Sequence, residues 1–156
     1  LNDLYDLADR LPFGIKTTAA PHYRRVVLER QRGVRRDGRK SAEGSLGPQQ
    51  APAPDGIVRA RDGVNDGKGV VFIDPLGEVC PSGFLPLSAG NVRQASLVER
   101  YRTHPLFREL RDPERLKNRC GICPYRELCG GSRARAYAQS GDYLADDPLC
   151  FYYPTP

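Results

Sequence analysis

The sequence predicts an α+β fold, in which a β-hairpin and short helices surround a cysteine-bound centre. Three observations support this prediction. Residues 69–84 place β-branched and aromatic residues on either side of the turn sequence Pro75-Leu76-Gly77. Residues 94–103 and 106–111 carry apolar side chains at helical spacing. Four of the five cysteines lie between residues 120 and 150. A module this small is expected to depend on a bound metal for its stability.

The four clustered cysteines have the spacing of ligands to one metal centre. They form a C-x2-C-x5-C pattern that a fourth thiol completes about twenty residues later: Cys120, Cys123, Cys129 and Cys150. The first pair flanks a turn, and one helical turn over residues 125–128 leads to the third thiol. Two glycines follow at 130 and 131, and their backbone can approach the centre and donate N–H groups to its sulfurs.

A helix is expected between the third and fourth cysteines. Ser132 is a suitable N-cap, residues 133–139 are good helix formers, and Gly141 is a suitable stop.

The spacing alone leaves three kinds of site open. A structural zinc site usually has two C-x2-4-C pairs, whereas here only the first pair is close. An iron–sulfur cubane accepts wider and less regular spacing, which favours a cluster. Disulfides would suit a secreted chain, but no signal peptide begins at residue 1.

The first third of the chain has a different character. Residues 1–11 predict an amphipathic helix ending at Pro12, residues 13–18 are β-prone, and a second helix is expected from Pro21 to about residue 32. Residues 33–68 are rich in glycine and proline and predict a flexible loop or linker, with a possible short strand at 57–58.

The net charge of +5 comes from a basic run at residues 24–40. Because no aromatic residue lies between Tyr23 and Phe72, stacking platforms for a nucleic acid are missing, and we expect a solvated basic loop with no nucleic-acid partner.

Several separate blocks resemble a known family. The segment from Cys80 to Gly90, the cysteine block with its glycine pair, and residues 141–150 are similar, in this order, to the SPASM tail of radical SAM proteins. The similarity covers roughly residues 66–153 and is greatest to the heme-maturation and peptide-maturation branch. It implies three parts: residues 1–32 as the end of an α/β partial barrel, 33–68 as the linker, and 69–156 as the auxiliary-cluster domain. The barrel's C-x3-C-x2-C loop for the catalytic cluster does not occur in this sequence.

The resemblance implies one auxiliary [4Fe-4S] cluster on the four clustered cysteines. Two further cysteines of the family pattern are replaced here by Ala95 and Arg133, which leaves Cys80 as an expected buried strand residue. S-adenosylmethionine and a second [4Fe-4S] cluster are expected only in a full-length protein. The cluster would support electron transfer or substrate docking. The alternative is a zinc-stapled interaction module without a redox role, so whether this chain is part of an enzyme stays open.

The expected partners follow from the same resemblance. They are a peptide or tetrapyrrole substrate and an electron donor such as flavodoxin or ferredoxin. No apolar run is long enough for a membrane span, and free thiols favour a cytoplasmic location.

We name no catalytic residue among the remaining polar side chains. His22 is expected to be structural or to face the missing barrel, and His104 to start a helix. The acidic and basic side chains near the cysteines are expected to cap turns, to form ion pairs, to offset cluster charge or to lie on the surface: Asp142, Asp146, Asp147, Arg119, Arg126, Arg133 and Arg135.

Overall fold

The computed structural model describes residues 1–8, 10–13, 17, 20–36 and 65–154. In chain order its elements are α1 (Asn2–Ala8), α2 (Tyr23–Arg36), β1 (Phe72–Ile73), β2 (Val79–Cys80), α3 (Leu97–Thr103), α4 (Pro105–Arg111), the 3-10 helix η1 (Pro113–Arg115), α5 (Asn118–Ile122) and α6 (Arg133–Ser140). Most of the β-prone segment at 13–18, and the possible strand at 57–58, lie outside the described residues.

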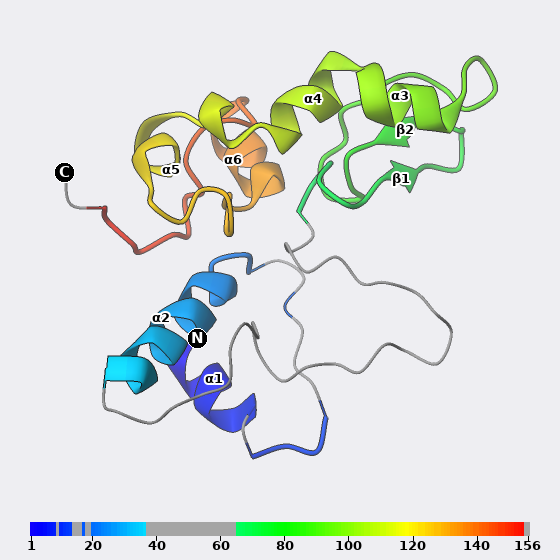
Figure 1. Ribbon diagram of the computed structural model, residues 1–156. Coiled ribbons are helices and arrows are strands. Elements are labelled where there is room, and N and C mark those ends of the chain that lie inside the picture. Colours follow the sequence, from blue (N-terminus) through cyan, green and yellow to red (C-terminus); the bar gives the residue numbers. More distant parts are fainter. Residues whose placement is uncertain (9, 14–16, 18–19, 37–64, 155–156) are drawn as a thin grey trace.

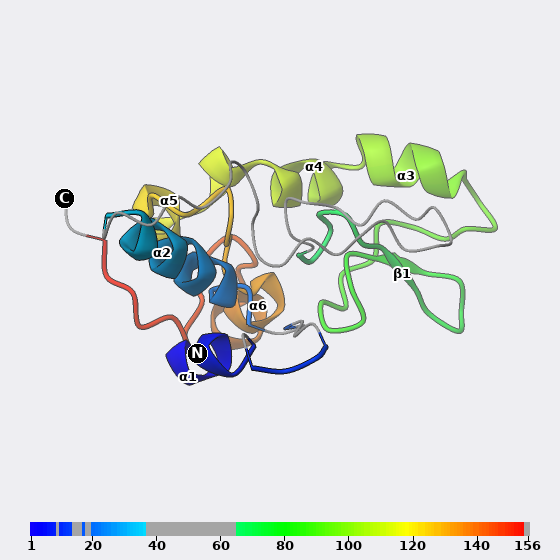
Figure 2. The ribbon, with the colours of Figure 1, turned by 60° about the horizontal axis from the view of Figure 1, so that its bottom comes forward.

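The elements from β1 onward form an elongated body (Figures 1 and 2). The hairpin and α3 occupy one end, and α5 and α6 occupy the other, with α4 between them. The pair α1 and α2 lies beside the end that holds α5 and α6. The cysteine-bearing segments are therefore at the end of the body that faces the N-terminal helices.

The predicted hairpin is present but short. The antiparallel strands pair Phe72 with Cys80 and Ile73 with Val79. Their turn is closed by the Gly77 N–H, which donates to the Asp74 carbonyl at 2.9 Å, and Gly77 has a φ of 90° that suits glycine. The backbone of Val79 also bonds the 89–90 segment, because its N–H donates to the Gly90 carbonyl at 2.8 Å.

One apolar core joins the hairpin to α4. Its buried members are Val79, Leu85, Ala89, Leu106, Phe107 and Leu110. Ala134 and Tyr137 of α6 pack against this cluster as partly buried neighbours. The core thus connects both ends of the elongated body and fixes α6 relative to the hairpin.

The helix boundaries follow from local capping. His104 is the N-cap of α4, and its Nδ1 accepts the Leu106 N–H at 3.3 Å, which confirms it as a helix-start residue. Ser132 caps α6 by accepting the Arg135 N–H at 3.3 Å. Gly141 ends α6 in the left-handed region with a φ of 74°, as predicted.

The basic run is not a solvated loop over its first part. Residues 23–36 form α2, which continues four residues beyond the expected end at 32. Arg24 and Arg25 are half-buried because they face the cysteine-bearing end. The Arg24 Nη1 donates to the Leu128 carbonyl at 3.3 Å, and the Arg25 guanidinium stacks 4.7 Å from the Tyr152 ring centroid.

None of the helices in the described ranges is long and apolar enough to cross a membrane.

Candidate metal centre

The four clustered cysteines line a single pocket. Cys120 lies on α5, Cys123 caps its end, and a helical turn closed by the Cys129 N–H to the Tyr125 carbonyl, at 2.8 Å, delivers Cys129. Cys150 completes the set from the C-terminal segment. All are free thiols. The other lining residues are Arg119, Arg126, Gly130, Gly131, Asp146, Asp147 and Tyr152.

Among the described residues, no three His, Cys, Asp or Glu side chains are grouped as they would be around a bound metal ion. The thiols therefore surround the pocket without converging on one point.

The glycine pair shapes the wall between the thiols and the protein interior. Gly130 and Gly131 both have a φ of 63°, a conformation that side-chain-bearing residues rarely adopt. A Cβ at Gly131 would lie 2.5 Å from Arg133 Nη2 and 3.4 Å from Cys120 Sγ. Only glycine leaves this side of the pocket open. An open side is needed if backbone N–H groups are to donate to the sulfur atoms of a bound group.

Burial and mutual repulsion act on the thiols. Burial raises the pKa of Cys129 to about 11, the Gly131 N–H opposes this shift, and charge on the other three thiols adds to it. Burial also raises the pKa of Cys123, against a hydrogen bond from the Tyr125 backbone. The pocket therefore disfavours several thiolates unless a cationic centre compensates them, which fits a metal or cluster as the bound group.

Two aspartates fix the loops that carry the thiols. Asp146 accepts the Cys120 N–H at 2.9 Å and the Arg119 Nε at 3.2 Å. Asp147 is fully buried and accepts four N–H groups: those of the Ser132 and Leu149 backbones and two from the Arg135 guanidinium. Although burial opposes ionisation, the bonds from Arg135, Ser132 and Leu149 hold the Asp147 pKa below its usual value. The expected pairing of Asp147 with Arg135 is confirmed, and the carboxylate ties the start of α6 to the approach to Cys150.

Arg133 is buried and therefore not a surface residue. Within the described part of the chain it forms no ion pair with an aspartate. It is 2% exposed, and its Nη1 donates to the carbonyls of Tyr143 and Ala145 at 3.0 and 2.7 Å. Its Nη2 lies 3.6 Å from Cys120 Sγ. A buried cation therefore contacts one of the candidate ligands.

Two other singled-out residues lie apart from the four thiols. Cys80 is buried in β2 and does not line the pocket, and burial raises the pKa of its thiol. His22 lies at the start of α2 with Nδ1 3.9 Å from Asp147 Oδ2, and burial lowers its pKa. His22 thus packs against the back of the pocket wall.

Sequence reasoning missed two residues that position this site. The Asn65 Nδ2 donates to the Gly131 carbonyl at 2.6 Å, and Asp66 accepts both the Ala134 N–H at 3.0 Å and the Ser82 hydroxyl at 2.5 Å. Both residues fall at the end of the segment predicted as a linker. The turn-forming sequence Asn65-Asp66-Gly67 was the available signal.

The chain is similar to several known proteins. No family model matches the chain. It is 38% identical over 154 residues to an AdoMet-dependent heme synthase of Methanosarcina barkeri, which covers 99% of this chain and 41% of that protein. A pre-heme d1 synthase of Dinoroseobacter shibae is 38% identical over 60% of the chain, and a PqqA peptide cyclase of Methylocella silvestris is 35% identical over 56%. The shorter matches fall on the C-terminal part of the chain.

These similarities fit the resemblance to a SPASM-type fragment of a radical SAM protein. Along nearly all of its residues it is related to the AdoMet-dependent heme synthases, and it spans about 40% of the length of those relatives.

Proposed function

We propose that this chain holds one auxiliary [4Fe-4S] cluster on Cys120, Cys123, Cys129 and Cys150, as part of a radical SAM enzyme that modifies a tetrapyrrole. The observation that carries the proposal is that these four thiols, which come from separate segments of the chain, line one pocket. The similarity to heme synthases favours a tetrapyrrole over a peptide, because it extends along 99% of the chain, whereas the match to a peptide cyclase covers 56%.

The chain's own residues would prepare the site for the cluster. The four thiolates would hold it, the Gly131 backbone would donate to Cys129, and the Asp146 carboxylate would keep the Cys120 loop in place. Arg133 would offset part of the negative charge of the thiolate-bound centre. A bound cluster would supply one-electron chemistry or a docking surface next to the reacting part of the enzyme.

The remaining partners belong to the full-length protein. S-adenosylmethionine and a second [4Fe-4S] cluster would bind the catalytic barrel, and flavodoxin or ferredoxin would supply electrons. As it stands this chain is not expected to cleave S-adenosylmethionine, because it contains no C-x3-C-x2-C motif.

Anaerobic reconstitution with iron and sulfide tests the proposal. We expect about four iron and four sulfide per chain, together with the broad visible absorption of a cubane. Stoichiometric, tight zinc binding without iron uptake would instead identify the site as a structural zinc staple, the alternative that the cysteine spacing leaves open.

A further inference from the structure

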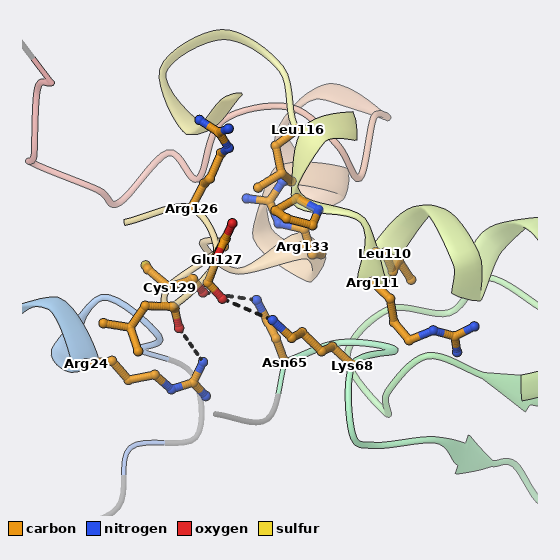
Figure 3. A pocket seen from close by; sticks show the side chains of 13 residues that line it. Arg24, Asn65, Lys68, Leu110, Arg111, Leu116, Arg126, Glu127, Cys129 and Arg133 are labelled. Atoms are coloured by element: carbon orange, nitrogen blue, oxygen red, sulfur yellow. Dashed lines mark hydrogen bonds between the residues drawn. The ribbon is translucent and has the colours of Figure 1, made fainter. Parts of the chain in front are cut away.

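A second pocket lies behind the Cys129–Gly130 backbone. Cys129 and Gly130 line both pockets, so this segment forms a shared wall. The other side of the second pocket comes from α4, η1 and the 65–68 turn that precedes the hairpin (Figure 3). A group bound there would sit one backbone layer away from the candidate metal centre.

Cationic side chains dominate this second pocket. Five basic residues line it, whereas Glu127 is its only acidic lining residue in the described part of the chain; the five are Arg24, Lys68, Arg111, Arg126 and Arg133. Of these, Arg126 forms an ion pair with Glu114. The cationic excess is large for a concave surface of this size and favours an anionic ligand.

Backbone carbonyls, rather than carboxylates, hold two of these cations in place. The Lys68 Nζ donates to the Glu127 carbonyl at 3.0 Å, and the Arg111 Nη1 donates to the Tyr101 carbonyl at 2.5 Å. A carbonyl orients a cation but leaves its net charge in place. Figure 3 shows Lys68 and Arg24 reaching toward the 127–129 segment, while Arg111 turns its head away from it.

Apolar side chains share the pocket with the charges. Leu110, Pro113, Leu116 and Leu128 form part of the lining. A carboxylate at the end of a hydrocarbon arm would match this mixture better than a small inorganic anion, since the arm would then cover part of the apolar wall.

We propose that this pocket binds the carboxylate groups of the substrate, with Lys68 as the principal accessible cation. The proposal rests on the proposed function, because carboxylates are the anionic groups that tetrapyrrole side chains and acidic peptides share. It places the substrate on the opposite side of the Cys129–Gly130 wall from the thiols. It also separates the roles of the cations: Arg133 contacts Cys120, whereas Lys68 donates to the Glu127 carbonyl on the outer face of the wall.

Binding assays on the reconstituted chain test the pocket. The probes are a porphyrin with four propionate side chains, its tetramethyl ester, a hexaglutamate peptide and inorganic phosphate. The variants are Lys68→Gln, Glu127→Gln and the matched control Arg108→Gln. Arg108 is exposed on α4, close in sequence to Leu110, yet does not line the pocket. It therefore reports on net charge alone.

The expected pattern is specific. The free-acid porphyrin should bind at least about tenfold more tightly than its ester, and Lys68→Gln should weaken binding by about tenfold, as for the loss of one charge-assisted bond. Arg108→Gln should change the Kd by less than about twofold, because an exposed distant charge is screened. Glu127→Gln should tighten binding, and it keeps the proposal testable if Lys68→Gln fails to fold. If hexaglutamate competes with the porphyrin, the bound carboxylates belong to a peptide substrate. If it does not compete, they belong to a tetrapyrrole.

Three results would overturn the pocket. The first is equal binding of the acid and the ester, and the second is equal effects of Lys68→Gln and Arg108→Gln on the Kd. The third is displacement of the porphyrin by inorganic phosphate, which would indicate a site for any small anion. Iron per chain is measured on every sample. Absence of iron with intact carboxylate binding would contradict the proposed cluster alone, and full iron without carboxylate binding would contradict this pocket alone.

Discussion

The Nη2 of Arg133 lies 3.6 Å from the Sγ of Cys120, and the guanidinium to which it belongs is almost fully enclosed by protein. The SPASM pattern that this sequence resembles has a cysteine at this position, so here a cation takes the place of a thiol. The three carbonyls that accept from Arg133, those of Gly131, Tyr143 and Ala145, orient it without cancelling its charge.

Arg133→Gln should lower the reduction potential of a cluster bound by the four thiols. Removing a nearby buried cation stabilises the oxidised, less negative state relative to the reduced one, by on the order of 50 mV if the charge contributes about 1 kcal/mol. Redox titration followed by electron paramagnetic resonance measures the shift. Arg133→Lys is the control, because it keeps the charge and should retain most of the potential; an equal shift in both variants would show that packing, not charge, is responsible.

Gly131→Ala should destabilise the protein far more than Gly141→Ala. Both glycines have positive φ, so both substitutions carry a backbone cost of about 1 kcal/mol. A Cβ at Gly131 would also meet Arg133 Nη2 and the Asp147 side chain, whereas nothing lies within 4 Å of one at Gly141. Urea unfolding and iron content measure the difference, and we expect an additional 1–3 kcal/mol, roughly, and reduced iron for Gly131→Ala only. Equal losses would contradict the close packing of this wall.

Cys150→Ala should lower the iron content of the reconstituted chain, whereas Cys80→Ala should leave it unchanged. Cys150 reaches the pocket only through α6 and the turn after it, so its loss should leave an oxygen-labile, three-thiolate site and a protease-sensitive C-terminal segment. Cys80 is buried in β2 away from the pocket, and its replacement should keep full iron at a cost of about 1 kcal/mol in packing. Iron analysis with limited proteolysis on both variants decides; loss of iron in Cys80→Ala alone would reverse the ligand assignment.

Local signals were sufficient for the ends of α6 and for the hairpin turn. Ser132 and Gly141 bound α6 because their capping chemistry depends on a few neighbouring residues, and Gly77 closes the hairpin for the same reason. The spacing of the four cysteines likewise predicted that they share a site, and the structure brings all four to one pocket.

Long-range contacts could not be predicted in this way. The burial of Arg133 depends on carbonyls ten and twelve residues later, and Asn65 reaches a carbonyl 66 residues away. Residue type gives no indication of such partners. For Arg133 the sequence left charge compensation of a cluster, an ion pair and a surface position open, and it placed Asn65 in a predicted linker. The basic run was misread for a related reason: the charge count did not reveal that Arg24 and Arg25 lie on the face of α2 that contacts the cysteine-bearing end.

The stability of the chain should fall at alkaline pH because of Tyr143. Burial, followed by its hydrogen bond to Glu109, raises the Tyr143 pKa to about 12, and the hydroxyl donates to Glu109 Oε2 at 2.6 Å. The unfolded chain loses this proton near pH 10, whereas the folded chain keeps it to about pH 12. Unfolding therefore becomes easier as the pH rises between these values, by up to about 2 kcal/mol after allowance for partial exposure.

Tyr143→Phe should remove this alkaline dependence and cost about 1–2 kcal/mol at neutral pH, where the bond between the 141–144 turn and α4 is lost. Urea unfolding of the wild type and the variant across pH 7–11 measures both effects. An unchanged alkaline slope in Tyr143→Phe would assign the dependence to another group.

The position of Asp147 has a consequence for the order in which a ribosome-bound chain can mature. The buried apolar residues of the hairpin and α4 have all been synthesised once Leu110 is made, before any of the four pocket thiols exists. The start of α6, in contrast, is anchored by a carboxylate that is made fifteen residues after Ser132, and the last thiol follows three residues after that. Translation thus produces the apolar core residues first and the segment that closes the pocket last, so a site with all four thiols is expected to form only after the Asp147–Cys150 segment has emerged.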